Sequence, residues 1–130
     1  MGIKTKIILI LLSATIVTAQ PEAQTWYFGI GAGIDFTSGN PEMISGPLKT
    51  NEGCSIFCDR FGKPIFFTDG QTIWNRDNKV MQNGTGLKGH PSSSQSAIVV
   101  EIPSNKNLYY VITALNVGRE QGLNYSLVDM

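Results

Sequence analysis

Charge is scarce in this sequence, and so are the residue types that most often carry chemistry. Asp, Glu, Lys and Arg make up 15% of the 130 residues, their formal charges sum to zero, and there are two cysteines and one histidine. No run of like charge occurs, so the sequence lacks the basic surface that nucleic acids and anionic membranes require. We therefore expect no nucleic-acid partner.

The main apolar run lies at the N-terminus. Lys4 and Lys6 precede a largely apolar stretch of eleven residues, Ile7–Val17, and small residues follow it up to Ala19. This order is typical of a secretory signal peptide, and the run is shorter than the roughly 20 residues that cross a bilayer as a helix. We expect residues 1–19 to be removed between Ala19 and Gln20, which leaves an exported chain with no stable membrane insertion.

Helical periodicity is absent after residue 19, and short β-prone runs separated by turn residues take its place. We expect strands at residues 26–28, 34–36, 55–59, 64–68, 71–76, 79–81, 97–102, 108–114 and 123–130. Residues 82–96 are rich in Gly and Ser and are predicted to form a long loop.

This pattern predicts an antiparallel all-β fold, and a propeller, a sandwich or an open barrel would each fit it. Three closely linked strands, a long crossing and a new pair are typical of one propeller blade leading to the next. Blades take about 40 to 50 residues, so residues 20–130 hold about two. We expect a partial β-propeller domain that is truncated at its C-terminus, because the sequence stops within an alternating strand pattern.

Tests for catalytic, cofactor and metal sites give no candidate. The glycine-rich stretch Gly29–Gly33 has Ile34 in place of the last glycine of a dinucleotide fingerprint, so a bulged sheet edge is the simpler interpretation. Cys54 and Cys58 would lie too far apart on a strand to pair, which leaves buried free thiols or an intermolecular bridge. His90 has no second histidine to share a metal, and its loop position indicates a solvated side chain.

The stretch TDGQTIW resembles, with altered spacing, the Asp-box of sialidase-like propellers, a structural turn between outer strands. We predict that Asp69 accepts hydrogen bonds from turn amides, that Gly70 supplies a positive φ, and that Trp74 packs across the sheet. These three residues are expected to be scaffold and not catalytic.

Several stretches together resemble one family: WYFGIGAGIDF, EGC, FFTDGQTIWNRDNKVMQNGTGL, SSSQSAIVV, and YYVIT followed by GLNYSLVDM. They are similar to the N-terminal WD40-like propeller region of large exported Bacteroidetes proteins that carry a gliding-motility-type C-terminal sorting domain read by type IX secretion. Further blades, downstream domains and the sorting domain of that family are missing here, and Cys58 stands where a small polar residue is expected. The resemblance implies a secreted or cell-surface protein without enzymatic activity.

We therefore expect a non-catalytic binding, adhesion or scaffold module linked to surface motility, with no cofactor or metal and an unknown protein or glycan at the cell surface as its partner. Trp26, Tyr27 and the loop 88–96 are the predicted contact residues. Two alternatives stay open: a propeller segment of a secreted sialidase- or glycosidase-like enzyme, and a truncated fragment with no function of its own.

Overall fold

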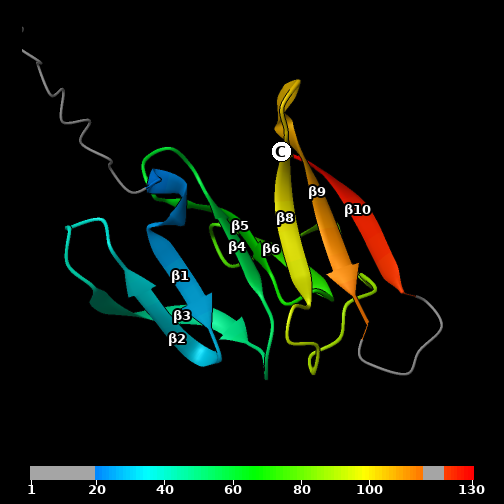
Figure 1. Cartoon of the computed structure of the whole chain (residues 1–130), viewed down its shortest axis with the longest axis horizontal. Coiled ribbons are helices and arrows are strands. Elements are labelled where there is room, and N and C mark those ends of the chain that lie inside the picture. The colour runs from blue at the N-terminus through cyan, green and yellow to red at the C-terminus, as the bar shows by residue number, and fades with distance from the viewer. Residues whose placement is uncertain (1–19, 116–121) are drawn as a thin grey trace, which may run out of the picture.

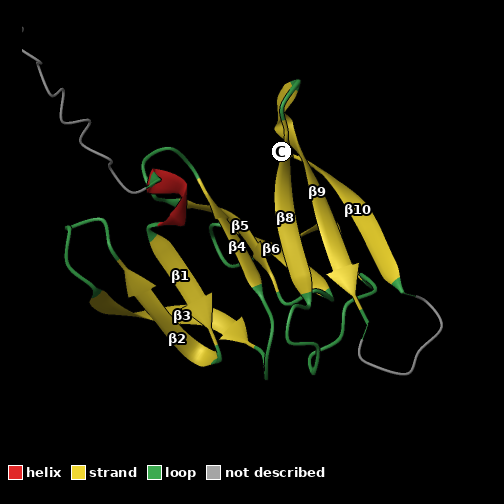
Figure 2. Cartoon of the chain, viewed as in Figure 1, coloured by secondary structure: helices red, strands yellow, loops and turns green. Residues whose placement is uncertain are grey.

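The structure is a computed structural model, and residues 20–115 and 122–130 are described. A single 3₁₀ turn, η1 (Pro21–Ala23), precedes ten strands (Figures 1 and 2). The strands are β1 (Thr25–Phe28), β2 (Ile30–Asp35), β3 (Glu42–Lys49), β4 (Ser55–Cys58), β5 (Pro64–Thr68), β6 (Thr72–Asn75), β7 (Val80–Thr85), β8 (Ala97–Ile102), β9 (Asn105–Ala114) and β10 (Leu123–Asp129). Ala19, on one side of the predicted cleavage site, lies outside the described residues, and Gln20 is exposed before η1.

The strands form three antiparallel sheets, with the orders β1-β2-β3, β4-β5-β6-β7 and β10-β9-β8. Every pairing joins strands that are neighbours along the chain, so each sheet is a simple meander. The prediction of an antiparallel all-β fold is confirmed. In Figure 1 the three sheets follow one another across the molecule from left to right.

Three local predictions were wrong. Strand β3 was missed, because Gly46 and Pro47 lie within it and both residues are rare in strands. The long loop was predicted to start at residue 82, but β7 continues to Thr85. The stretch Gly29–Gly33 does carry a bulge, between Ile30 and Ala32, yet β2 is the middle strand of its sheet and not an edge.

The sheet β4–β7 is the middle layer of a stack. Successive strand residues point to opposite faces, and on β5 both Phe66 and Phe67 are buried. Phe67 meets Tyr27 of β1 edge-to-face, with ring centroids 5.5 Å apart, whereas Phe66 meets Tyr109 of β9 at 5.3 Å. The sheet β1–β3 therefore covers one face of the middle sheet, and β8–β10 covers the other.

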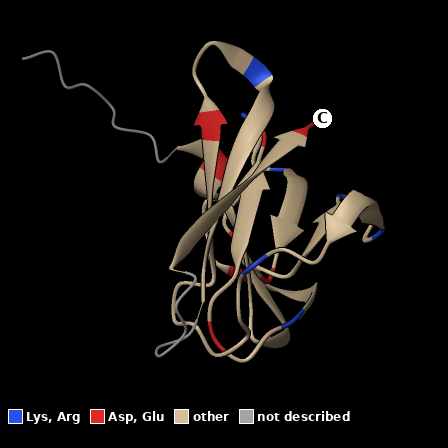
Figure 3. Cartoon of the chain, turned by 90° about the vertical axis from the view of Figure 1, so that its right-hand side faces the viewer, with Lys and Arg blue, Asp and Glu red and all other residues tan. Residues whose placement is uncertain are grey.

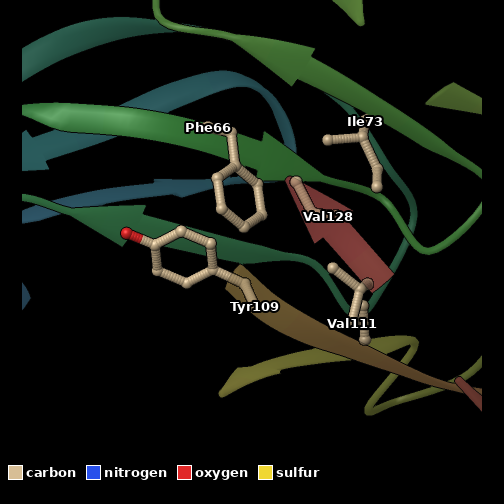
Figure 4. Packing of buried hydrophobic residues seen from close by; sticks show 6 residues of the cluster. Phe66, Ile73, Tyr109, Val111 and Val128 are labelled. Carbon is tan, nitrogen blue, oxygen red and sulfur yellow. The ribbon is translucent and has the colours of Figure 1, made fainter. Parts of the chain in front are cut away.

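The main hydrophobic core lies between β4–β7 and β8–β10. Figure 4 shows the side chains of its buried cluster converging from the two sheets. The cluster consists of Phe66, Ile73, Ala97, Tyr109, Val111 and Val128. Tyr109 buries its ring there and donates its hydroxyl to the carbonyl of Lys106 at 2.7 Å, so its polar end is satisfied.

Replacing Phe66 with Ala should lower the free energy of unfolding by about 3–5 kcal/mol, because the ring is fully buried between two sheets and its loss leaves a cavity. Phe61→Ala is the control, since that ring is 64% exposed in the β4–β5 turn and its loss should cost at most about 1 kcal/mol. Urea denaturation followed by tryptophan fluorescence measures both values. Equal losses in the two variants would contradict this account of the core.

Candidate functional site

The Asp69-Gly70 pair forms the turn between β5 and β6. Asp69 Oδ1 accepts hydrogen bonds from the backbone N–H groups of Gln71 and Thr72, both at 2.8 Å. Gly70 has a φ of +89°, and its own N–H donates to the hydroxyl of Thr68 at 2.9 Å. This arrangement satisfies the turn's main chain with short side chains, so Asp69 serves the scaffold in this structure.

The same turn holds the segment that leads into β8. Ser96 is fully buried and donates its hydroxyl to the carbonyl of Asp69 at 2.7 Å. The N–H of Gly89 donates a hydrogen bond to the carbonyl of Gly70 at 2.8 Å. The N–H of Gly53 donates one to the carbonyl of Ser93 at 3.0 Å. A Cβ at Gly70 would overlap the Ser96 side chain, a Cβ at Gly89 would overlap the Gly70 main chain, and a Cβ at Gly53 would overlap the Ser96 amide.

Trp74 lies on β6, next to Phe67 of β5 in the sheet register. Their rings stack at 5.8 Å with planes 14° apart. Cross-strand partners share a face of the sheet, so Trp74 lies on the face that β1–β3 covers. Its role in this position is packing between neighbouring strands.

The C-x₃-C spacing has a structural use that sequence reasoning missed. Both cysteines are free thiols. Cys54 donates to the carbonyl of Tyr27 at 3.1 Å, and Cys58 donates to that of Thr25 at 3.9 Å, so both thiols face β1 of the neighbouring sheet. Burial raises the pKa of both thiols, that of Cys58 to about 11. At neutral pH they are protonated, and a thiol is a weak nucleophile.

His90 also takes part in local structure. Its Nδ1 accepts a hydrogen bond from the backbone N–H of Ser92 at 3.1 Å, and its main-chain carbonyl accepts one from the backbone N–H of Ser93. Within residues 20–115 and 122–130, no three His, Cys, Asp or Glu side chains gather closely enough to hold a metal ion.

The predicted contact residues do not form one surface. Trp26 is half exposed on the outer face of β1. Tyr27 points the opposite way, onto Phe67, and is only partly exposed. Within the loop 88–96, Ser93 and Ser96 are buried against the turn described above.

A groove of about 490 Å³ lies between β7 and β10. Each of these strands is the last of its sheet, so one row of main-chain groups on each faces away from its own sheet. Apolar residues of the core region, among them Ile73 and Val128, line the groove together with polar residues from both edges. The polar residues are Gln82, Asn83, Thr85, Ser126 and Asp129.

A bulge in β7 produces the polar wall of this groove. Trp74 pairs with Val80 and Thr72 pairs with Thr85, so a step of two residues on β6 faces a step of five on β7. The surplus residues are accommodated at Asn83, whose φ of +56° is left-handed. Bulges redirect side chains at sheet edges, and Gln82 and Asn83 are both exposed here. The Asn-Gly pair at 83–84 was the sequence signal for this local departure from a regular strand.

No known family model matches this chain, and no curated protein or solved structure shows significant similarity to it. In the part of the chain that the structure describes, no helix has the length and apolar character needed to cross a bilayer.

Gly70→Ala should destabilise the fold by at least about 2 kcal/mol more than Gly86→Ala. Both glycines have a positive φ, which costs a residue with a Cβ roughly 1–2 kcal/mol. Only at Gly70 does the added methyl group also overlap Ser96, whereas nothing lies within 4 Å at Gly86. Thermal and urea denaturation of the two variants measure the difference. Equal stabilities of the two variants would contradict this prediction, because they would show that the Ser96 side chain moves away from the added methyl group at little energetic cost.

The buried Cys58 thiol should make stability fall above pH 9. Its pKa rises from 9.0 to about 11 on folding, so the unfolded chain loses this proton first as the pH rises, and the folded state is disfavoured between these values. The contribution of Cys58 to the free energy of unfolding is fully present below pH 9. Above this pH it should decline by about 1 kcal/mol per pH unit at most. Cys58→Ala should flatten this part of the pH–stability curve, and an unchanged slope would contradict the assignment.

Proposed function

We propose that this chain is an exported, non-catalytic binding or adhesion module of the cell surface, and that its ligand binds in the groove between β7 and β10. The observation that carries the proposal is the β7 bulge. It places two exposed amide side chains, Gln82 and Asn83, beside the hollow between two sheets. Concave sites with an apolar floor and a few polar groups are the usual form of binding sites.

The proposed architecture is part of a WD40-like β-propeller. In support, β4–β7 is a four-stranded antiparallel meander, and β8–β10 starts a second meander that packs face-to-face on the first. Four-stranded sheets arranged in this way are the blades of propellers. The resemblance to exported Bacteroidetes proteins adds the proposed surface location and a link to type IX secretion and surface motility.

The residues with reactive side chains support a non-catalytic role. Both thiols are protonated and hydrogen-bonded to main-chain carbonyls, and His90 is engaged in its own turn. Asp69 is engaged by turn amides. Each of these groups has a structural use, which supports a binding or scaffold role over the glycosidase alternative.

The groove suits a glycan better than a compact protein surface. Amide and hydroxyl side chains of Gln82, Asn83, Thr85 and Ser126 match the donors and acceptors of sugar hydroxyls. The more exposed apolar residues of the lining, Met81, Leu87 and Leu127, provide surface for the C–H faces of a sugar ring. We therefore propose a surface oligosaccharide as the ligand class.

A glycan array probed with the exported chain, followed by calorimetric titration of the best ligand, tests this proposal. Gln82→Ala and Asn83→Gly should each weaken binding about three- to tenfold, because each removes one amide from the groove. Glycine at position 83 tolerates the positive φ, so that variant keeps the bulge.

Gln71→Ala is the matched control, since it removes the same amide from an exposed position outside the groove lining. The control should bind like the unmodified chain. A blank array, or equal affinities for all four proteins, would contradict the proposal.

A further inference from the structure

Two turns of the middle sheet have the same sequence pattern. The β4–β5 turn, residues 59–63, reads DRFGK, and the β6–β7 turn, residues 75–79, reads NRDNK. The fourth residue has a positive φ in both turns, +77° at Gly62 and +61° at Asn78. Each turn thus has Asp or Asn first, Arg second, a left-handed residue fourth and Lys last.

The hydrogen bonds of the two turns match as well. In both, Oδ1 of the first residue accepts hydrogen bonds from the backbone N–H groups of the third and fifth residues, at 2.8–3.0 Å. The N–H of the first residue donates to the carbonyl of the fifth, at 2.8 Å from Asp59 and at 2.9 Å from Asn75. Short side chains that bond their own turn in this way fix its shape. The Arg and the Lys of both turns are therefore carried on equivalent backbones.

The two turns lie side by side. The meander β4-β5-β6-β7 changes direction at each turn, so the β4–β5 and β6–β7 turns share one end of the sheet. Phe66 near the start of β5 pairs with Asn75, the first residue of the second turn. Neighbouring strands lie about 4.8 Å apart, which places the centres of the turns about 10 Å apart.

The charges of one turn act on the other. Desolvation raises the pKa of the Asp59 carboxyl, but the backbone hydrogen bonds from Lys63 and Phe61 and the positive charges of Arg76 and Lys63 outweigh it, so this pKa is lowered. A cation of the second turn therefore lies near the carboxylate of the first.

The four cations of the turns, Arg60, Lys63, Arg76 and Lys79, are all exposed. They are four of the ten Lys and Arg residues of the chain. None of them forms an ion pair with another described residue, and Arg60 lies over the ring of Phe61 at 4.8 Å. Charged positions are otherwise sparse, and most of the ribbon in Figure 3 is tan. The fold thus gathers cations that are separated in the sequence, where no run of like charge marks them.

We propose that these two turns bind an acidic polysaccharide through its carboxylate or sulfate groups. Arg and Lys are the side chains that bind such anions, Arg with two parallel hydrogen bonds. Four cations against Asp59 and Asp77 give the pair of turns a net charge of +2.

The spacing of the charges favours a polysaccharide over a nucleic acid. Each turn places one acid among its two cations, and the turn centres are about 10 Å apart. A nucleic-acid strand has a phosphate about every 3.4 Å, so it would place phosphates against Asp59 and Asp77 as well as against the cations. A polysaccharide with an acidic group on every second sugar has more widely spaced charges and contacts each turn with one anion.

This site is separate from the groove between β7 and β10, because no residue of either turn lines that groove. The inference therefore does not depend on the groove. Only the choice of a glycan over other polyanions rests on the proposed surface location.

Calorimetric titration of the exported chain with four polymers is the test. Hyaluronate has one carboxylate on every second sugar, and κ-carrageenan has one sulfate on every second sugar. Dextran is the neutral control, and oligothymidylate tests a nucleic acid. We expect binding to hyaluronate, κ-carrageenan or both, none to dextran, and an affinity that falls as the salt concentration rises. The acidic polymer that binds tells carboxylate from sulfate recognition.

Single lysine variants locate the site. Lys63→Gln and Lys79→Gln should each weaken binding about three- to tenfold, because each removes one cation from a turn. Lys88→Gln is the matched control, since it removes the same charge from an exposed lysine next to Gly89, which bonds to the β5–β6 turn at the opposite end of the sheet. This control should bind like the unmodified chain.

Asp77→Asn should act in the opposite direction. It removes a negative charge beside the cations but keeps the main-chain N–H that Asn75 binds, so the turn stays intact. Binding should strengthen about two- to threefold, and thermal denaturation should show an unchanged stability.

Two results would overturn the proposal. One is the absence of binding to both acidic polysaccharides, or tighter binding to oligothymidylate than to either of them. The other is a Lys88→Gln variant that binds as weakly as Lys63→Gln, which would show that net charge alone decides the affinity. Neither result bears on the groove, whose variants at Gln82 and Asn83 lie outside both turns.

Discussion

Three main-chain segments approach one another around Ser96 so closely that a side chain fits at none of the contact points. Gly53, Gly70 and Gly89 are those points, and Ser96 bonds to the carbonyl of Asp69 among them. This junction fixes where the chain leaves the middle sheet and where β8 begins. Because β8 starts one residue later, the junction also sets the position of the third sheet on the second. The core between Phe66 and Tyr109, and the groove between the sheet edges, both depend on that position.

The middle sheet shows why this chain needs apolar residues on consecutive strand positions. Strands of a sheet with one solvent-exposed face alternate apolar and polar residues. Phe66 and Phe67 are instead both buried, because each faces a different neighbouring sheet. Among residues 20–115 and 122–130, the outer sheets are covered on one side only, yet several large apolar side chains lie on their other sides, among them Trp26, Met43 and Tyr125.

The sequence predicted the strands and the Asp69-Gly70 turn well, because these depend on local chemistry. An Asx side chain and a glycine specify a tight turn within four residues, and alternation specifies a strand within six. Strand β3 was missed because it contains Gly46, a residue type that is rare in strands. The strand needs a glycine at this position because a Cβ there would press on the carbonyl of Ala32 on the neighbouring strand. The partners of Cys54 and Cys58 could not be predicted either, since the carbonyls they bond lie 27 and 33 residues away in the chain.

The groove and the outer face of β8–β10 meet at Leu127, which lines the groove and is also the cross-strand partner of the outward-facing Tyr110. Ser126 and Val128 line the groove and lie on the inner side of the strand, whereas Tyr125 points outward. A molecule bound in the groove would therefore contact the inner side of β10 and, through Leu127, the edge of its outer side as well.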